Sequence, residues 1–443
     1  MTQAHAEFSR EFLKNLYKFS LTNNSKLFVF NSVYDFAENK NKGARSVYYG
    51  IPYEKLSALV ILHETIFDST LVDRIIRDAK EHNVPVIMAR KYDPRCISVI
   101  GEYEDVYTDM MTKIIKDRDL KDIVYIAGKK VPDIDYDSKI RIHCFKNALE
   151  NVGITYNQDN LFFGGFWEKP VIEVIEKILD KRERIPDAIF CGNDIMAQSV
   201  MNVLFERGIN VPKDVVVTGF DGLEAFRYST PALTSCVENL DDLCSTIFEV
   251  IGKLEEDSFP TTHYYNYKAV FSESCGYECP QRVDLNSDIT KLFELSRVNY
   301  TTEFWSGVWL ENLLLNKGRL EDFYESLKSY ITNDYNIAIC PLEVARVINP
   351  QYHVLDEKMN LYYINRATHE MEHKDFWASS LAPDFDEWMN DDSVCIETAL
   401  YADRNCYGVT FEKGTDIDEL CYVVNRHAQT LNNALLACLI KEI

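Results

Sequence analysis

The sequence of 443 residues lacks the features that would place it at a membrane. It holds no run of about 18 consecutive apolar residues, the length that a membrane-spanning helix requires. Its first twenty residues are polar and amphipathic, without the apolar core of a secretory signal peptide. We therefore expect a cytoplasmic protein that has no membrane partner.

Positive charge is also scarce. The chain carries 47 Lys and Arg against 70 Asp and Glu, a formal net charge of −23 at pH 7, and no basic cluster of five or more residues. A surface of this sign repels phosphate groups, so we expect no direct nucleic acid binding by this chain.

Most recognisable catalytic and metal-binding patterns are missing as well. There is no G-x-S-x-G elbow, no G-x-x-x-x-G-K-[ST] loop and no G-x-G-x-x-G turn. The twelve cysteines lie mainly in aliphatic segments, which suits a reducing compartment. The close pair Cys275 and Cys279 has no second pair to complete a zinc site. We predict a non-enzymatic chain with no cofactor, metal or catalytic residue.

One stretch competes with that prediction. His369-Glu370-Met371-Glu372-His373 fits HExxH, in which two histidines on one helix face bind zinc. The longer zinc-peptidase pattern fails, because Phe376 and Ser379 stand where it needs Gly and His. We expect a loop or short helix between strands and a chance match, with a zinc hydrolase kept as an alternative.

The sequence is rich in residues that can form hydrophobic cores, since 46% of the residues are hydrophobic and 12% are aromatic. At this length they predict two or three domains. Up to about residue 270, short apolar runs alternate with amphipathic stretches such as 69–83 and 171–184. This alternation predicts βαβ units and two doubly wound parallel sheets. The predicted strands are 26–30, 58–62, 84–89, 122–128, 160–166, 187–193 and 214–220.

After the polar run 273–288 the pattern changes. Residues 287–316 and 319–334 predict two helices, and residues 416–440 predict a long final helix. Between them, four β-rich runs predict a mostly antiparallel sheet. These runs are 335–340, 359–364, 393–401 and 406–412. The arrangement is that of an α+β sensor-like domain.

Residues 185–236 carry a dense series of motifs in a fixed order. A strand is followed by Asn193-Asp194, then by a helix, an "RG-x-x-VP-x-DV" string, "GFD" at 219–221 and "P-x-LT" at 231–234. Upstream, residues 141–154 fit an R-x-x-G-F-x-x-A-L segment with Cys144 in place of Gly. The chain resembles the effector-binding domain of the lac-repressor/galactose-repressor family over roughly residues 7–275.

The resemblance implies a fold and a domain division. We expect a two-lobed periplasmic-binding-protein-like domain at 1–272, with an N-lobe of about 1–95 plus 238–262 and a C-lobe of about 104–236. A linker at 273–288 and an α+β GAF-like domain at 289–443 follow. In the branch that this chain resembles, such sensors precede GGDEF diguanylate cyclase or helix-turn-helix output modules, and no output motif is present here.

The family begins with a strand and a small-residue turn before its first helix, whereas this chain opens directly on the helix. The first strand of the fold is therefore expected to be missing. Either the chain is part of a longer protein, or another segment fills the gap.

Polar and aromatic residues follow several predicted strands, where open α/β sheets bind ligands. A carboxylate and an amide suit hydroxyl groups, and an aromatic ring covers the apolar face of a sugar or base. The resemblance gives effector contact to Arg141, Asn193 and Asp221, with Phe166 as the stacking ring. The full predicted set is Phe166, Trp167, Arg141, Asn193, Asp221, His63 and Arg90.

Each of these residues also has a structural alternative. Asn193 and Asp194 are suited to cap the helix that follows them, and Asp221 to form a turn. The last helix carries Leu431, Leu435 and Cys438 at helical spacing, which indicates packing against its own domain or a parallel dimer seam. We predict a homodimeric sensor of a sugar-like or nucleoside-like effector, with a ligand-free interaction scaffold as the rival.

Overall fold

The computed structural model describes most of the chain before residue 280 and selected segments after it. Up to 279 it omits only 2–3, 5, 34–41, 63–64, 67, 131–133, 223–228 and 255–259. From 290 it describes 290, 293, 296–297, 300, 304, 307–311, 313, 323, 336–347, 358–364, 371–377, 389, 391–402 and 405–442.

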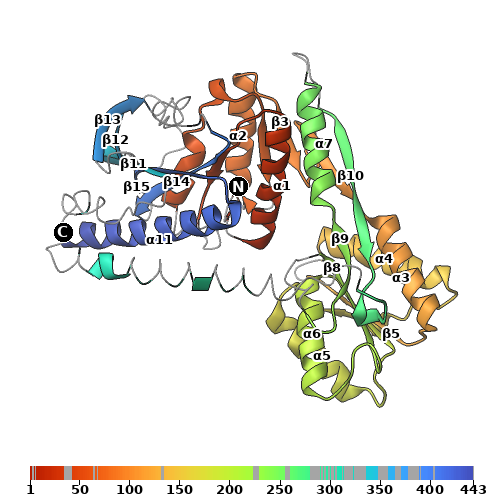
Figure 1. Ribbon diagram of the computed structural model, residues 1–443. Coiled ribbons are helices and arrows are strands. Elements are labelled where there is room, and N and C mark those ends of the chain that lie inside the picture. The colour runs from red at the N-terminus through yellow and green to blue at the C-terminus, as the bar shows by residue number, and fades with distance from the viewer. Residues whose placement is uncertain are drawn as a thin grey trace. The chain divides into compact units, whose positions relative to one another are not determined.

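The chain forms two compact units (Figure 1). Unit 1 comprises 1–100, 243–263 and 291–443, and unit 2 comprises 101–242 and 264–290. The chain passes from one unit to the other within β4 (Ile97–Glu102) and within β10 (Thr262–Val270).

Unit 2 contains a doubly wound sheet in the order β10-β9-β8-β7-β5-β6. All neighbours run parallel except β10, which is antiparallel to β9. The strands are β5 (Ile123–Ala127), β6 (Leu161–Phe163), β7 (Ala188–Cys191), β8 (Val216–Asp221) and β9 (Thr234–Glu238). Strands β5 and β7 are buried along their whole length, which explains the continuous apolar runs at these positions in the sequence.

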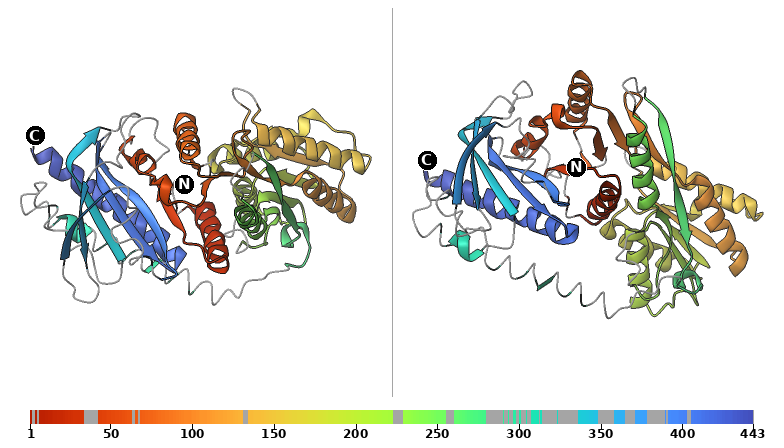
Figure 2. Two further views of the ribbon diagram at one scale, coloured as in Figure 1. Left: turned by 90° about the horizontal axis from the view of Figure 1, so that it is seen from above. Right: turned by 45° about the horizontal axis from the view of Figure 1, so that its top comes forward.

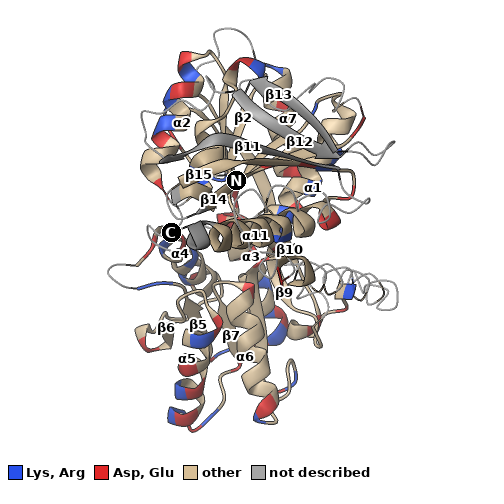
Figure 3. Ribbon diagram, turned by 90° about the vertical axis from the view of Figure 1, so that its left-hand side faces the viewer, with Lys and Arg blue, Asp and Glu red and all other residues tan. Residues whose placement is uncertain are grey.

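Helices cover both faces of this sheet (Figure 1). They are α3 (Glu104–Arg118), α4 (Tyr136–Asn151), α5 (Glu168–Lys181) and α6 (Asp194–Glu206). Val171 and Ile175 of α5 and Val200 of α6 pack on Ile126 and Ile189, while Phe145 of α4 stacks on Tyr125 of β5. Figure 3 shows Lys and Arg interspersed with Asp and Glu along α5, so this helix carries no basic stripe.

Unit 1 contains a shorter parallel set, β2 (Leu59–Leu62), β3 (Val86–Ala89) and the start of β4, in that order. Its helices are α1 (Glu7–Thr22), α2 (Ser69–Glu81) and α7 (Leu240–Gly252), the last beginning within unit 2. The side chain of Asp68 accepts hydrogen bonds from the Thr70 and Leu71 amides and so fixes the start of α2.

A second, six-stranded sheet in unit 1 has the order β1-β14-β15-β11-β12-β13. It is antiparallel except at β1, which runs parallel to β14. The strands are β1 (Phe28–Asn31), β11 (Asn336–Val347), β12 (Lys358–Ile364), β13 (Met371–Trp377), β14 (Val394–Ala402) and β15 (Asn405–Gly414). Figure 2 shows α11 (Ile417–Glu442) running along one face of this sheet.

All seven strands predicted before residue 270 are present, but the first has an unexpected partner. Residues 26–30 contain β1, which joins the C-terminal sheet through the pairs Val29–Ile396 and Phe30–Glu397. Val29 and Ile396 share a core with Val424 of α11, because both side chains point to the same face of the sheet. Strands β4, β9 and β10 were not predicted.

One prediction for the C-terminal part is wrong. The expected loop or short helix around the HExxH match is in part a strand, because β13 begins at Met371 and pairs His373 with Tyr362. Of the two alternatives for the last helix, packing against its own domain is confirmed, because Leu431, Leu435 and Cys438 are buried in that domain. Their core neighbours include Trp309 and Leu400.

The opposite face of β14 packs against the 3-10 helix η1 (Lys42–Tyr49), where Ala44 contacts Ala399 and Tyr401. Elements near the N-terminus therefore share cores with β14 and α11. The predicted domains at 1–272 and 289–443, with a linker at 273–288, stay predictions. Unit 1 contains residues from both predicted domains.

The carboxyl group of Glu397 gives this packing a pH dependence. Its neighbours in register are Phe30 and Phe411, and it shares its strand face with Ala399 and Tyr401. Burial raises the pKa of Glu397 well above its ordinary value. The folded chain therefore binds more protons than the unfolded chain once the pH exceeds about 4.5, the ordinary pKa.

We expect the chain to lose stability as the pH rises from about 5 towards the raised pKa of Glu397, because the ionised carboxylate is disfavoured there. Glu397→Gln keeps the neutral shape, so its melting temperature relative to wild type should increase with pH. The control is Glu173→Gln on exposed α5. Equal pH profiles for wild type and Glu397→Gln in thermal denaturation would contradict the assignment.

Candidate functional site

The carboxyl ends of β5, β7 and β8 meet at one edge of the unit 2 sheet. Gly128 follows β5, Gly192 and Asn193 follow β7, and Asp221 ends β8. The helix α4 starts after β5 with Asp135 as its cap, which accepts a hydrogen bond of 2.9 Å from the Ser138 amide.

Arg141 of α4 is the centre of this edge. Its guanidinium carbon lies 3.8 Å from the ring centre of Phe220, and Phe166 and Tyr103 follow at 5.7 and 6.0 Å. Its Nη1 donates a hydrogen bond to the carbonyl of Gly192. The side chain is only 11% exposed, so cation–π attraction and the carbonyl replace water around the charge.

Asp221 supplies the opposite charge. One of its carboxylate oxygens lies 3.7 Å from Arg141 Nη2, and the side chain remains 33% exposed. Burial by itself lowers the pKa of Arg141, but Asp221 and other neighbours outweigh it and the pKa is raised. The pair is therefore a cation held inside the unit beside a carboxylate that reaches solvent.

Phe166 is placed by backbone geometry. Both Gly165 and Phe166 have positive φ, +69° and +67°, which turns the chain sharply after β6. The ring then lies against Gly128, where a Cβ atom would come within 2.0 Å of the Phe166 ring. Gly128 is therefore required for this ring position, and the sequence reasoning did not single it out.

Asn193 forms the start of α6, as its structural alternative predicted. Its Oδ1 accepts a hydrogen bond of 3.0 Å from the Met196 amide, and its Nδ2 donates one of 3.2 Å to the Phe166 carbonyl. Asp194 is not the cap that was expected. Its carboxylate instead accepts hydrogen bonds from the Gly222 amide at 2.7 Å and from Ser235 Oγ at 2.6 Å.

Two of the remaining predicted contacts, Trp167 and Arg90, have other surroundings. Trp167 precedes α5 and is 57% exposed. Arg90 belongs to unit 1, where its guanidinium lies 4.1 Å from the ring centre of Phe8. His63 lies outside the described residues. The structure thus brings together Arg141, Phe166, Asn193 and Asp221.

Tyr103 joins the cluster without having been predicted. Its ring packs edge-on against Phe220 at 5.0 Å, and its buried hydroxyl has no hydrogen-bond partner among the residues that the structure describes. Burial raises the pKa of Tyr103, so the hydroxyl stays protonated. No local motif marked it, because its contact with Phe220 joins residues far apart in the sequence.

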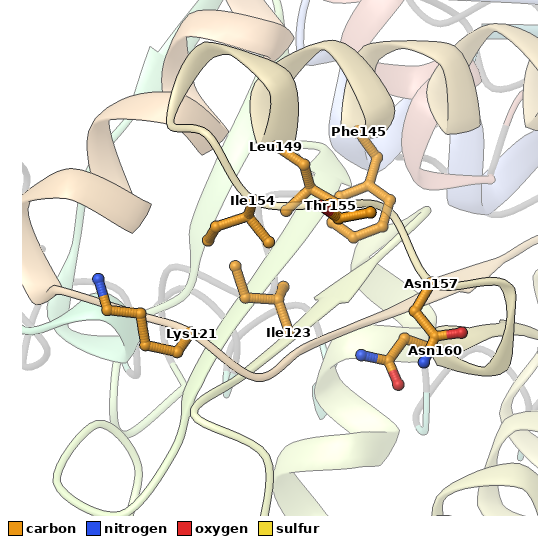
Figure 4. Close-up of a pocket in the computed structure, with 8 residues that line it drawn as sticks. All are labelled: Lys121, Ile123, Phe145, Leu149, Ile154, Thr155, Asn157 and Asn160. Carbon is orange, nitrogen blue, oxygen red and sulfur yellow. The ribbon is translucent and has the colours of Figure 1, made fainter.

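A cavity at the other edge of the sheet does not extend this site (Figure 4). It measures about 40 Å³ and lies where β5 begins, between Ile123, the end of α4 and the segment 154–160. Its lining residues are Lys121, Ile123, Phe145, Leu149, Ile154, Thr155, Asn157 and Asn160. This volume suits a water molecule or two and excludes a sugar.

The described residues contain no group of three or more His, Cys, Asp or Glu side chains arranged to hold a metal ion. Three of the five residues of the HExxH match lie in β13, so His373 is on a strand and not on the helix that a zinc peptidase needs. His369 and Glu370 lie outside the described residues. Cys275 is buried, with its sulfur 3.4 Å from the Val217 carbonyl. Within the described part of the chain, no helix is both long and apolar enough to cross a membrane.

Residues 113–264 match the family model described as "Periplasmic binding protein-like domain". The segment includes every residue of the cluster except Tyr103. The predicted α/β periplasmic-binding-like fold is thereby confirmed for this part of the chain.

The chain is also similar to curated proteins that are named as regulators. Over 180 residues the chain is 29% identical to catabolite control protein A of Priestia megaterium, covering 40% of this chain and 53% of that protein. It is 31% identical over 176 residues to the HTH-type transcriptional repressor PurR of Pasteurella multocida, covering 39% and 52%. The chain therefore spans about half the length of the curated relatives it matches.

Among solved structures, the chain is similar to a LacI family sugar-binding transcriptional regulator from Escherichia coli complexed with phosphate. The identity is 21%, the TM-score is 0.47, and the match covers 63% of this chain and 97% of the other. A transcription regulator from Lactobacillus plantarum matches at 16% identity and a TM-score of 0.49, covering 62% and 97%.

We expect Arg141→Lys to lower the free energy of unfolding by about 1–3 kcal/mol, because an ammonium cannot stack on Phe220 as a planar guanidinium does. Urea unfolding followed by tyrosine fluorescence measures the change. Arg184→Lys is the matched control, since Arg184 is almost fully exposed and its replacement should change stability by less than about 0.5 kcal/mol. Equal effects of the two replacements would show that the stacked position has no special role.

Proposed function

We propose that the chain is a non-enzymatic sensor that binds a small hydroxyl-bearing effector, sugar-like or nucleoside-like, at the Arg141–Asp221 cluster. One observation carries the proposal: a buried cation, a partly exposed carboxylate and an aromatic ring converge at the carboxyl ends of the strands. Ligands of open α/β sheets bind at this edge.

The chemistry of each group supports this effector class. A carboxylate such as that of Asp221, whose side chain is 33% exposed, can accept hydrogen bonds from hydroxyl groups. The Arg141 guanidinium places a positive charge 3.7 Å from the Asp221 carboxylate at the same edge. Phe166 offers a ring to the apolar face of a sugar or base. Asn193 positions Phe166 through its carbonyl, while Trp167, Arg90 and His63 stay predicted ligand contacts.

The proposal extends to what the sensor controls. The relatives are named as transcriptional regulators, so effector binding in this chain would regulate an output such as a transcriptional regulator or a diguanylate cyclase. Closure of a binding domain around its ligand shifts the population of two conformations, which is how such a signal would leave the site. We propose a cytoplasmic homodimer that does not itself bind nucleic acid.

The C-terminal part is proposed to be GAF-like. Its support is the order β14-β15-β11-β12-β13, all antiparallel, with α11 packed on one face. A domain of this type would add a second sensory input or pass the signal on.

A thermal-shift screen against sugars, sugar phosphates, nucleosides and amino acids tests the effector proposal. A ligand at 100 times its dissociation constant stabilises the native state by about 2.7 kcal/mol, which raises the melting temperature by several degrees. Asp221→Ala and Arg141→Ala should each abolish the shift.

The matched control for this screen is Asp180→Ala, a carboxylate on α5 that is exposed and paired with Arg207. It should leave the shift intact. A cooperative melt with no shift across the whole library would reject the sensor proposal. That result would favour a ligand-free scaffold. In such a scaffold Gly192, Phe220 and Asp221 are the permanent partners of Arg141, and no ligand contacts it.

A further inference from the structure

Two tyrosines of unit 2 pack on the same phenylalanine but differ in what their hydroxyl groups contact. The rings of Tyr103 and Tyr107 each meet Phe220 edge-on, at 5.0 Å between ring centres. The hydroxyl oxygen of Tyr107 lies 3.3 Å from that of Tyr125, within hydrogen-bond distance. The buried hydroxyl of Tyr103 has no such partner among the described residues. Tyr107 therefore completes its hydrogen bonding within the described chain, whereas Tyr103 does not.

The ring of Tyr103 is also held from a second side. Tyr267 of β10 lies 5.2 Å from it, between ring centres, and contacts Phe220 at 5.6 Å. A ring packed in this way cannot turn its hydroxyl to a new partner without losing both ring contacts. The direction of the Tyr103 hydroxyl is therefore set by the fold.

Arg141 has an unused donor near this hydroxyl. Its Nη1 donates to the Gly192 carbonyl, but its Nε is buried without a hydrogen-bond partner in the part of the chain that the structure describes. The guanidinium carbon lies 6.0 Å from the ring centre of Tyr103. Burial raises the pKa of Tyr103 and the positive charge of Arg141 offsets part of that rise, so the two groups are within electrostatic reach. Two neighbouring unsatisfied groups call for one shared partner, because each alone costs folding free energy.

We infer that Tyr103 is a specificity-determining residue of the effector site, whose hydroxyl donates together with Arg141 Nε to one uncharged hydroxyl oxygen of the effector. This inference rests on the proposed function and adds to it a residue and the group that the residue recognises.

The chemistry of the donors identifies that group. The Nε of arginine can only donate, and a tyrosine hydroxyl can donate as well, so an acceptor oxygen satisfies both. A phosphate is disfavoured there, because the Asp221 carboxylate lies 3.7 Å from Arg141 Nη2 and repels a second negative charge. A hydroxyl is favoured over other neutral acceptors, because it can also donate and Asp221 is an acceptor at the same edge.

Thermal unfolding without any effector tests the first part of the inference. Tyr103→Phe removes only the hydroxyl, so the melting temperature should rise by about 2–4 °C, because a buried group without a partner is lost. Tyr107→Phe is the matched control, since its ring meets the same Phe220 but its hydroxyl contacts Tyr125. Its melting temperature should fall by a similar amount. A fall for Tyr103→Phe as well would overturn the inference, because the hydroxyl would then be hydrogen-bonded in the free protein, for example to water.

Isothermal titration calorimetry tests the second part with ribose, galactose and adenosine and with the monodeoxy analogues of each. A probe that binds wild type should bind Tyr103→Phe about tenfold more weakly and Tyr107→Phe with unchanged affinity. One monodeoxy analogue should lose about the same factor on wild type. It should lose no further factor on Tyr103→Phe, because the group missing from the analogue and the group missing from the variant are partners.

The outcomes separate this inference from the proposed function. Equal affinity of wild type and Tyr103→Phe for a bound probe would overturn the inference and leave the sensor proposal standing. Additive losses for every monodeoxy analogue on Tyr103→Phe would also overturn it, because no probe hydroxyl would then be the partner of Tyr103. No binding of any probe by wild type would count against the proposed function and against this inference with it.

Discussion

The candidate site depends on one buried cation. The guanidinium of Arg141 is buried, and its contacts are the ring face of Phe220, the carbonyl of Gly192 and the carboxylate of Asp221. A buried charge is tolerated only when its surroundings replace its hydration, so these groups must keep their places for unit 2 to stay folded. The positive φ at Phe166, the missing Cβ of Gly128 and the cap at Asn193 all serve to hold the ring and strand ends around this charge.

A similar argument applies to unit 1, where a strand near the N-terminus completes a sheet formed near the C-terminus. Strand β1 satisfies the backbone groups at the edge of β14, and Val29 enters the core beneath α11. An unpaired strand edge is a liability, so this addition protects the C-terminal sheet. Elements from both ends of the sequence thus share cores in unit 1, because η1 also packs on the other face of β14.

Much of the fold could be read from the residues. The apolar runs at 122–128, 187–193 and 214–220 became β5, β7 and β8, because strands buried on both faces need side chains that are apolar throughout. Arg141, Phe166, Asn193 and Asp221 came from motif order, and the structure brings them together. Tyr103 and Gly128 were missed. Tyr103 contacts Phe220, which is distant in the sequence, and Gly128 matters because it has no Cβ atom to clash with the Phe166 ring.

The sequence by itself determined where most of the buried parallel strands lie and which polar residues follow them, since periodicity and turn chemistry are local. Only the tertiary structure decided the partner of β1 and the strand at Met371–Trp377. It also decided that Asn193 caps α6 while Asp194 accepts a hydrogen bond from the Gly222 amide. The physical reason is that backbone hydrogen bonds between strands are alike for every sequence. Which edge a strand joins therefore depends on side chains that lie hundreds of residues away, as Val29 and Ile396 do.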